Sequence, residues 1–196
     1  MSISVIIATI PGRENLLERA VNSVINQTLK ADEIIICCDN QKLGAPINRD
    51  KALNKITNEF VAILDDDDYL LPLHLEVLFS TIKEQNADLV YPAWQQEQGL
   101  VTHLNYIFGK QWDNSEIHQV PITWMARTQS LIDVGGFSSG FDVNLHELDE
   151  QGHRIGEDFN IIKKLVKSNK KIFHVNEVTW VWNSENPGST QGRPNK

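Results

Sequence analysis

Apolar segments alternate with amphipathic ones through the first half of the chain, and this alternation limits the fold more than any other feature. Ser4 to Thr9, Glu33 to Cys38 and Phe60 to Leu64 are apolar along nearly their whole length and rich in β-branched residues. Such strands are typical of parallel sheets that are covered on both faces. Apolar residues at helical spacing follow the first two segments, in Leu17 to Val24 and Pro46 to Thr57. The pattern predicts an α/β fold with right-handed crossovers.

The second half of the chain is less periodic. The strands expected there are Asp88 to Tyr91, a short piece within Val101 to Phe108, Lys171 to Val175, and Val178 to Trp182. Pro72 is expected as the first residue of a helix. Thr128 is expected to cap a short helix that stops at Gly135-Gly136.

A last helix is expected over Glu157 to Lys167. Its apolar residues Phe159, Ile162 and Val166 recur at helical spacing, and we expect them on the inner face. The polar segment from Asn186 to Lys196 is expected to be a tail.

The size of the chain fits one domain, or two small lobes around a shared core, because it has 196 residues. The formal net charge of −8 disfavours broad, nonspecific adhesion to nucleic acid or anionic lipid. The two cysteines, Cys37 and Cys38, are adjacent, which is a poor arrangement for a structural disulfide. We therefore expect a cytoplasmic protein.

The apolar start of the chain is expected to be a buried strand. Met1 to Ile10 lacks the basic residues that open a signal peptide, and it runs directly into Pro11-Gly12-Arg13. No uncharged apolar stretch approaches the roughly 20 residues that a membrane-spanning helix needs. Any association with a membrane is therefore expected to be peripheral.

Four consecutive aspartates, Asp65 to Asp68, follow the third expected strand. Ligands of open α/β sheets bind at the carboxyl ends of the strands, where the loops Thr9 to Arg13 and Asp39 to Leu43 are also expected. Like charges this close repel one another, so an ordered arrangement favours a bound cation. Mg²⁺ or Mn²⁺ bound by one or two carboxylates and a substrate diphosphate is the site that we infer.

Two other interpretations of the aspartates are open. They can form a solvated turn, as most acidic runs do. They can also begin a calcium loop, since Asp65, Asp67 and Glu76 match its first, third and twelfth positions. Leu70 stands where that loop requires glycine, which disfavours the calcium interpretation.

The chain resembles the family-2-like glycosyltransferases, which have the GT-A fold, from Ser4 to about Asn183. The matching motifs, in chain order, are Ser4-Val5-Ile6-Ile7-Ala8-Thr9 with Pro11 and Arg13, Ser23-Val24-Ile25-Asn26-Gln27-Thr28, Glu33-Ile34-Ile35-Ile36, Arg49, Phe60 to Pro72, Val134-Gly135-Gly136-Phe137 and Gly156-Glu157-Asp158-Phe159. The resemblance implies a single GT-A domain. Its expected parts are a nucleotide-sugar-binding half (1–95), an acceptor-binding half (96–185) and the polar tail (186–196).

The resemblance also implies a nucleotide diphosphate sugar as the donor, with uridine favoured over guanosine and thymidine. Its expected contacts are Thr9, Pro11, Arg13, Asp39, Arg49, Asp65 and Asp66. Asp65-Asp66-Asp67 matches the family's DxD motif, in which the last aspartate is the expected ligand of Mn²⁺ or Mg²⁺, with Asp65 beside it. Arg49 is expected either on the diphosphate or paired with the aspartate run, and as an ordinary helix arginine otherwise.

Asp158 is the expected general base, with Glu157 beside it, because transfer with inversion needs a carboxylate that accepts the acceptor's proton. The structural alternative is that both acidic residues simply favour the first turn of a helix. His174 is a candidate metal ligand, since the histidine that many relatives carry after the tryptophan is absent at Asn183. A lone strand histidine is more often structural.

The acceptor is open at this point. Trp94, Trp112 and Trp124 are either core residues or stacking surfaces, and one of them is expected to line the acceptor cleft. Lysines at 163, 164, 167, 170 and 171 form either a solvated face or a contact for a phosphate-bearing acceptor. That acceptor is then a glycan, a lipid-linked sugar or a hydroxylated base in DNA.

A polar segment within Leu100 to Asn114 or Asp142 to Arg154 is expected to close over the donor. Two other functions remain open: a nucleotidyltransferase that forms sugar nucleotides, and a binding module without activity. The first is disfavoured because Ile10 to Arg13 is poor in glycine for a phosphate-binding loop.

Overall fold

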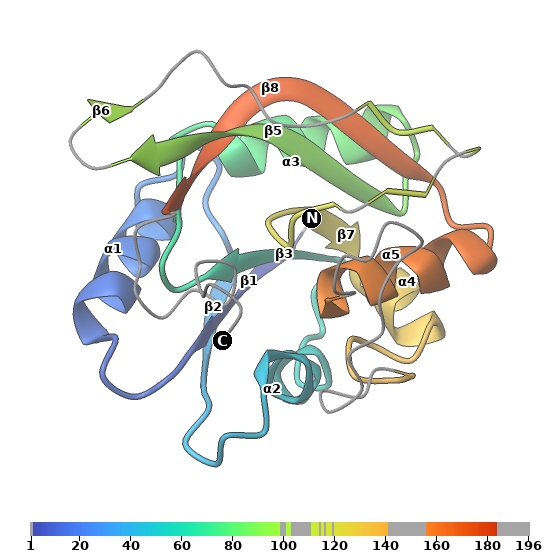
Figure 1. Ribbon diagram of the computed structural model, residues 1–196. Coiled ribbons are helices and arrows are strands. Elements are labelled where there is room, and N and C mark those ends of the chain that lie inside the picture. Colours follow the sequence, from blue (N-terminus) through green and yellow to red (C-terminus); the bar gives the residue numbers. More distant parts are fainter. Residues whose placement is uncertain are drawn as a thin grey trace.

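One mixed sheet runs through the computed structural model, which describes residues 2–98, 101–102, 111–113, 115, 117–118, 120–140 and 156–183 (Figure 1). The strands are β1 (Ile3–Thr9), β2 (Glu33–Cys38), β3 (Phe60–Asp65), β4 (Tyr69–Leu70), β5 (Leu89–Gln98), β6 (Val101–Thr102), β7 (Met125–Arg127) and β8 (Ile172–Asn183). Their order is β2-β1-β3-β7-β5-β8-β4, with β6 beside β5. The long pairings, of β1 with β2 and β3 and of β5 with β8, are parallel, which confirms the predicted fold class.

Helices cover both faces of this sheet. They are α1 (Glu14–Ile25), α2 (Ala45–Leu53), α3 (His74–Glu84), α4 (Thr128–Asp133) and α5 (Glu157–Lys167). The apolar residues of α1 and α3 belong to one core, and those of α2, α4 and α5 belong to the other. Figure 1 shows α1 and α3 apart from the group formed by α2, α4 and α5.

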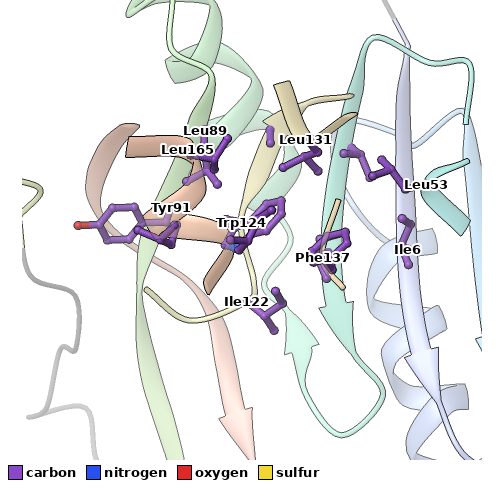
Figure 2. Packing of buried hydrophobic residues seen from close by; sticks show 14 of the residues in the cluster. Ile6, Leu53, Leu89, Tyr91, Ile122, Trp124, Leu131, Phe137 and Leu165 are labelled. Atoms are coloured by element: carbon purple, nitrogen blue, oxygen red, sulfur yellow. The ribbon is translucent and has the colours of Figure 1, made fainter. Parts of the chain in front are cut away.

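The core under α2, α4 and α5 is built around Trp124. Its indole is fully buried and stacks on Phe137, with ring centres 6.0 Å apart. Figure 2 shows these two rings between Tyr91 of β5 and Ile6 of β1, with Leu131 of α4 above them. Close packing of this kind fixes the turn after α4, to which Phe137 belongs, against the sheet.

The parallel register brings three loops to one edge of the sheet. Thr9 at the end of β1 pairs with Cys38 at the end of β2, and Ala8 pairs with Asp65 at the end of β3. The segments that follow these strands therefore start side by side. This is the edge at which ligands of open α/β sheets bind.

Two predicted helix starts are wrong. Leu71 N–H still donates to the carbonyl of Thr179 beside β4, so α3 begins at His74 and Pro72 precedes it instead of opening it. Thr128 is the first helical residue and does not cap, because Arg127 is still paired with Phe60 in the sheet and stands at the cap position.

The end of the chain also differs from prediction. The two expected closing strands are one strand, β8, because a bulge opposite Pro92 and Ala93 absorbs the residues between them. On α5 the fully buried apolar residues include Ile161 and Leu165 beside the predicted Ile162, whereas Phe159 is half-buried. Most of the segment 101–108 and the tail 186–196 lie outside the described residues.

Candidate active site

The four aspartates form a tight turn between β3 and β4. Asp65 ends β3, and the amide of Asp68 donates to the carbonyl of Asp65 over 3.3 Å. The next two residues, Tyr69 and Leu70, pair with the end of β8. The turn is therefore held by the sheet on both sides, and its carboxylates have little freedom to separate.

Asp66 is tied to the loop that follows β1. Its Oδ2 accepts a hydrogen bond of 2.6 Å from the Thr9 hydroxyl, and its Oδ1 accepts one of 2.7 Å from the Arg13 guanidinium. Asp66 is only 2% exposed. Thr9 and Arg13, which were predicted to contact the donor, thus anchor the aspartate turn, while Pro11 between them is exposed.

The other three aspartates of the turn face one another. Each of Asp65, Asp67 and Asp68 offers a carboxylate oxygen, and these oxygens all lie within 4.8 Å of one another. Asp68 is 3% exposed, and its Oδ1 accepts the backbone N–H of Asn183 over 2.9 Å. Carboxylate oxygens alone are a donor set that suits hard cations such as Mg²⁺ and Mn²⁺. The described residues therefore fit the metal that the DxD motif implies.

Burial and mutual repulsion raise the pKa of two of these carboxylates. The pKa of Asp65 is raised to about 6, first by burial and then by the charges of Asp67 and Glu157, against the opposing effect of Arg49. Burial and then the charges of Asp65 and Asp67 raise the pKa of Asp68 well above its usual range. A divalent cation relieves this repulsion and keeps the carboxylates ionised.

Arg49 of α2 bridges two acidic residues that lie 92 positions apart in sequence. One of its terminal nitrogens donates to Asp65 Oδ1, and the other donates to Glu157 Oε1 over 2.6 Å. Burial acts to lower the pKa of Arg49, but the two carboxylates outweigh burial and raise that pKa, so the side chain is charged. Of the roles expected for Arg49, the structure shows the pairing with the aspartate run.

Asp158 and Glu157 are the first two residues of α5. The Asp158 carboxylate accepts the N–H of Phe159 over 2.8 Å, whereas the Glu157 carboxylate is committed to Arg49. Gly156 precedes the helix, and a Cβ there would lie 2.5 Å from Asp158 Oδ1. Glycine thus makes room for the carboxylate of Asp158 at the helix start.

Asp39 organises the loop between β2 and α2. Its two carboxylate oxygens accept the amides of Leu43 at 2.9 Å and Gly44 at 2.7 Å. Burial raises the pKa of Asp39, but these amides outweigh it and hold the pKa below the usual value. The carboxylate expected beside the donor therefore also fixes the entry of the helix that carries Arg49.

His174 does not join the carboxylates. The metal-ligand group found among the described residues consists of Asp65, Asp67 and Asp68, whereas His174 lies opposite Tyr91 near the start of β8. Its ring lies 4.8 Å from that of Tyr91, and burial lowers its pKa. The structure thus gives no support to the prediction of His174 as a ligand, because Asn183, at the other end of β8, is the residue whose amide reaches Asp68.

The three candidate tryptophans have different surroundings. Trp124 is a core residue, as described above. Trp94 is half-buried and stacks on Trp180 with ring centres 5.8 Å apart. Trp112 is half-buried beside Tyr91 and His118. Trp94 and Trp112 are thus the two that retain exposed surface.

The lysine cluster is largely engaged in contacts within the chain. Lys164 donates to the carbonyls of Gly136 and Ser139, Lys170 pairs with Asp133 at 2.7 Å, and Lys171 donates to the carbonyl of Gln85. These contacts favour the structural interpretation of the cluster over a phosphate-binding surface.

Two contacts of the site were missed from the sequence. Arg19 of α1 donates to the backbone carbonyl of Asp67 at 2.5 Å and lies over the ring of Tyr69. Asp68 was not singled out as a ligand because strand alternation pairs Asp65 with Asp67. The run of four aspartates was the available signal for Asp68, whereas nothing in the sequence marked Arg19.

Comparison with known proteins identifies the family. The model of "Glycosyl transferase family 2" matches residues 39–142, which is just over half of the chain. The chain belongs to glycosyl transferase family 2. The resemblance that the motifs indicated is thereby confirmed.

Relatives in this family include curated glycosyltransferases. An uncharacterized glycosyltransferase of Methanocaldococcus jannaschii is 31% identical over 113 residues, which is 44% of this chain and 39% of that protein. Glycosyltransferase GlyA of Streptococcus pneumoniae is 22% identical over 86% of this chain and 29% of its own length. The chain thus spans well under half the length of these relatives.

Solved structures with the same architecture include S. aureus TarS. Its fragment 1–349 in complex with UDP-GlcNAc matches 99% of this chain and 62% of that chain, with a TM-score of 0.75 and 18% sequence identity. The likeness shows that the family 2 chain has the GT-A fold. The helices in the described part of the chain are all too short or too polar to cross a lipid bilayer.

Proposed function

We propose that this family 2 chain is a metal-dependent inverting glycosyltransferase that moves a sugar from a UDP-sugar to an acceptor hydroxyl. One observation carries the proposal: three carboxylates in a turn at the ligand-binding edge of the sheet, joined through Arg49 to the helix start that bears Asp158. Uridine is favoured because TarS, which has the same fold, forms a complex with UDP-GlcNAc.

Asp65, Asp67 and Asp68 would hold the cation. When bound, Mn²⁺ or Mg²⁺ supplies positive charge that stabilises the departing diphosphate. Asp66 keeps the turn in place through Thr9 and Arg13. We assign the base and ribose of the donor to the loops that carry Pro11 and Asp39, within the half of the chain formed by residues 1–95.

Asp158 would act as the general base. The acceptor oxygen attacks the anomeric carbon, its proton passes to the Asp158 carboxylate, and the bond between the anomeric carbon and the diphosphate breaks. Attack on the face opposite the leaving group inverts the anomeric configuration. Glu157 cannot serve equally well, because its carboxylate is held by Arg49.

The acceptor side is assigned to residues 96–185. A lipid-linked sugar is one candidate, because a relative 32% identical over 108 residues is the "GalNAc(5)-diNAcBac-PP-undecaprenol beta-1,3-glucosyltransferase" of Campylobacter jejuni. A glycan and a hydroxylated base in DNA are the others. A cytoplasmic location belongs to the same proposal. The segments expected to close over the donor, 100–114 and 142–154, lie largely outside the described residues.

The test is release of UDP from a panel of UDP-sugars with Mn²⁺, with and without candidate acceptors. We expect activity in the wild type and in the control Asp133→Asn, an exposed residue that pairs with Lys170 and Gln129 on the surface. Asp67→Ala and Asp158→Asn should each lose at least about 100-fold. Unchanged activity in both variants would remove the mechanism.

The same preparation distinguishes the other functions. A nucleotidyltransferase would release pyrophosphate from a nucleoside triphosphate and a sugar phosphate. A binding module would bind the donor without turnover across the acceptor panel. Either result in the wild type would replace the present proposal.

A further inference from the structure

Arg49 occupies a position from which it contacts both halves of the site. It is 2% exposed, and its two terminal nitrogens are divided between Asp65 at the end of β3 and Glu157 at the start of α5. A planar guanidinium presents its donors at fixed angles, so it sets the relative position of the two acceptors. The fork therefore fixes the first turn of α5 relative to one of the metal-binding carboxylates.

Asp50, the next residue of α2, holds a second segment. Its Oδ1 accepts the amide of Phe137 at 2.7 Å, and its Oδ2 accepts the amide of Ser138 at 2.9 Å and the hydroxyl of Ser138 at 2.5 Å. Phe137 lies in the turn after α4 and its ring faces the Arg49 guanidinium at 6.0 Å. Two consecutive residues of α2 thus bind two different parts of the second half of the chain.

The same turn also holds α5 directly. Asn160 and Lys164 of α5 both donate to the carbonyl of Ser139, at 3.3 Å and 3.0 Å, and Lys164 also donates to the carbonyl of Gly136. These contacts hold α5 at residues three and seven positions beyond its first residue. Among the described residues, it is the ion pair of Arg49 with Glu157 that holds the first residue of the helix.

We propose that Arg49 and Glu157 are positioning residues that hold Asp158 at a set distance from the metal-binding turn. Glu157 directly precedes Asp158, so a shift of the Glu157 backbone moves the Asp158 carboxylate with it. Misplacement of a catalytic group by about 1 Å can cost about 100-fold in rate. The inference rests on the proposed function for the role of Asp158, but the tether itself can be tested without any activity.

The first test is hydrogen exchange of the peptide that covers the start of α5. The amide of Asn160 donates to the carbonyl of Gly156, so exchange at this amide reports opening of the first turn. We expect faster exchange in Glu157→Gln and also in Arg49→Lys, which changes no atom of α5 and loses the fork. Glu177→Gln, the same chemical change at an exposed residue of β8, should leave exchange unchanged.

Arg49→Lys separates the tether from a purely local effect. Removal of the Glu157 charge alone can loosen a helix start, since acidic residues there are favoured by the macrodipole. That local effect would leave exchange in Arg49→Lys at the wild-type rate, and such a result would overturn the proposal. Equal acceleration in both single variants, with no further acceleration in the double variant, would support it.

The second test separates rate from binding. We expect Glu157→Gln to lower kcat for donor turnover by at least about tenfold while the Kd for UDP with Mn²⁺ changes by less than about threefold. A loss confined to Kd would assign Arg49 and Glu157 to the donor instead. If the wild type lacks turnover, the proposed function fails, whereas the exchange experiment still decides whether the tether exists.

Discussion

Replacement of Gly136 by alanine tests how strongly the turn after α4 depends on Asp50. Gly136 has φ of +70°, and a Cβ there would lie 2.3 Å from Asp50 Oδ1 and 3.0 Å from its carboxyl carbon. The first contact is far inside van der Waals distance. The carboxylate of Asp50 must therefore move away from Phe137 and Ser138, whose hydrogen bonds it accepts.

Two terms contribute to the expected loss of stability. A left-handed backbone costs an alanine about 1–2 kcal/mol relative to glycine. Weakening of hydrogen bonds to a charged acceptor costs about 1.5–3 kcal/mol for each bond that is lost. With one to two of the three bonds lost, Gly136→Ala should lower the free energy of unfolding by about 2.5–8 kcal/mol.

The chain offers a matched control at Gly140. Its φ is +71°, and a Cβ there meets no atom of the described residues within 4 Å. Gly140→Ala therefore carries the backbone term without the contact term, and it should cost only about 1–2 kcal/mol in urea unfolding followed by circular dichroism. Equal losses in the two variants would refute the contact with Asp50 as the cause.

Two further predictions concern buried polar groups. Thr9→Val should lower the free energy of unfolding by about 1–3 kcal/mol in urea, because Asp66 loses a buried hydrogen bond; a neutral result would contradict that role. Burial lowers the pKa of His74 to about 3, below the unfolded value of 6.5. The stability contributed by this buried neutral imidazole is therefore fully present above pH 6.5 and is lost as the pH falls toward 3. Between pH 6 and 4 the stability of His74→Gln should therefore fall less steeply than that of the wild type, by about 1.4 kcal/mol per pH unit, and parallel curves would refute this.

The first half of the fold could be predicted from the sequence because its signals are local. The apolar run Glu33 to Cys38 is the observed strand β2, and Phe60 to Leu64 is β3 without its last residue. Parallel pairing then places the loops after these strands together without further information. The helix starts at Pro72 and Thr128 were mispredicted because hydrogen bonds to Thr179 and pairing with Phe60 outweigh local capping preferences.

The residues of the candidate site were predicted from the sequence, but the contacts between their side chains were not. The positions of Asp65, Asp67 and Asp158 followed from motifs, whereas the partners of Thr9 and Arg13 did not. A sequence motif does not predict which side chains contact one another in the folded chain.

The ion pair between Arg49 and Glu157 is the clearest case of a contact that the sequence could not predict. It joins residues 108 positions apart, and both have ordinary structural explanations when considered singly. The assignment of His174 as a ligand stays a prediction without support for the same reason, because the pairing of the strands decides which end of β8 lies beside the aspartates.

The central claim is that Asp65, Asp67 and Asp68 bind a cation that in turn binds a sugar nucleotide, while Asp66 does not. Titration calorimetry of Mn²⁺ and UDP into the wild type, Asp67→Asn, Asp68→Asn and Asp66→Asn tests it most directly. We predict a loss of Mn²⁺ affinity of at least about tenfold in Asp67→Asn and Asp68→Asn, and of less than about threefold in Asp66→Asn. Absence of binding to the wild type, or an equal loss in Asp66→Asn, would contradict the claim.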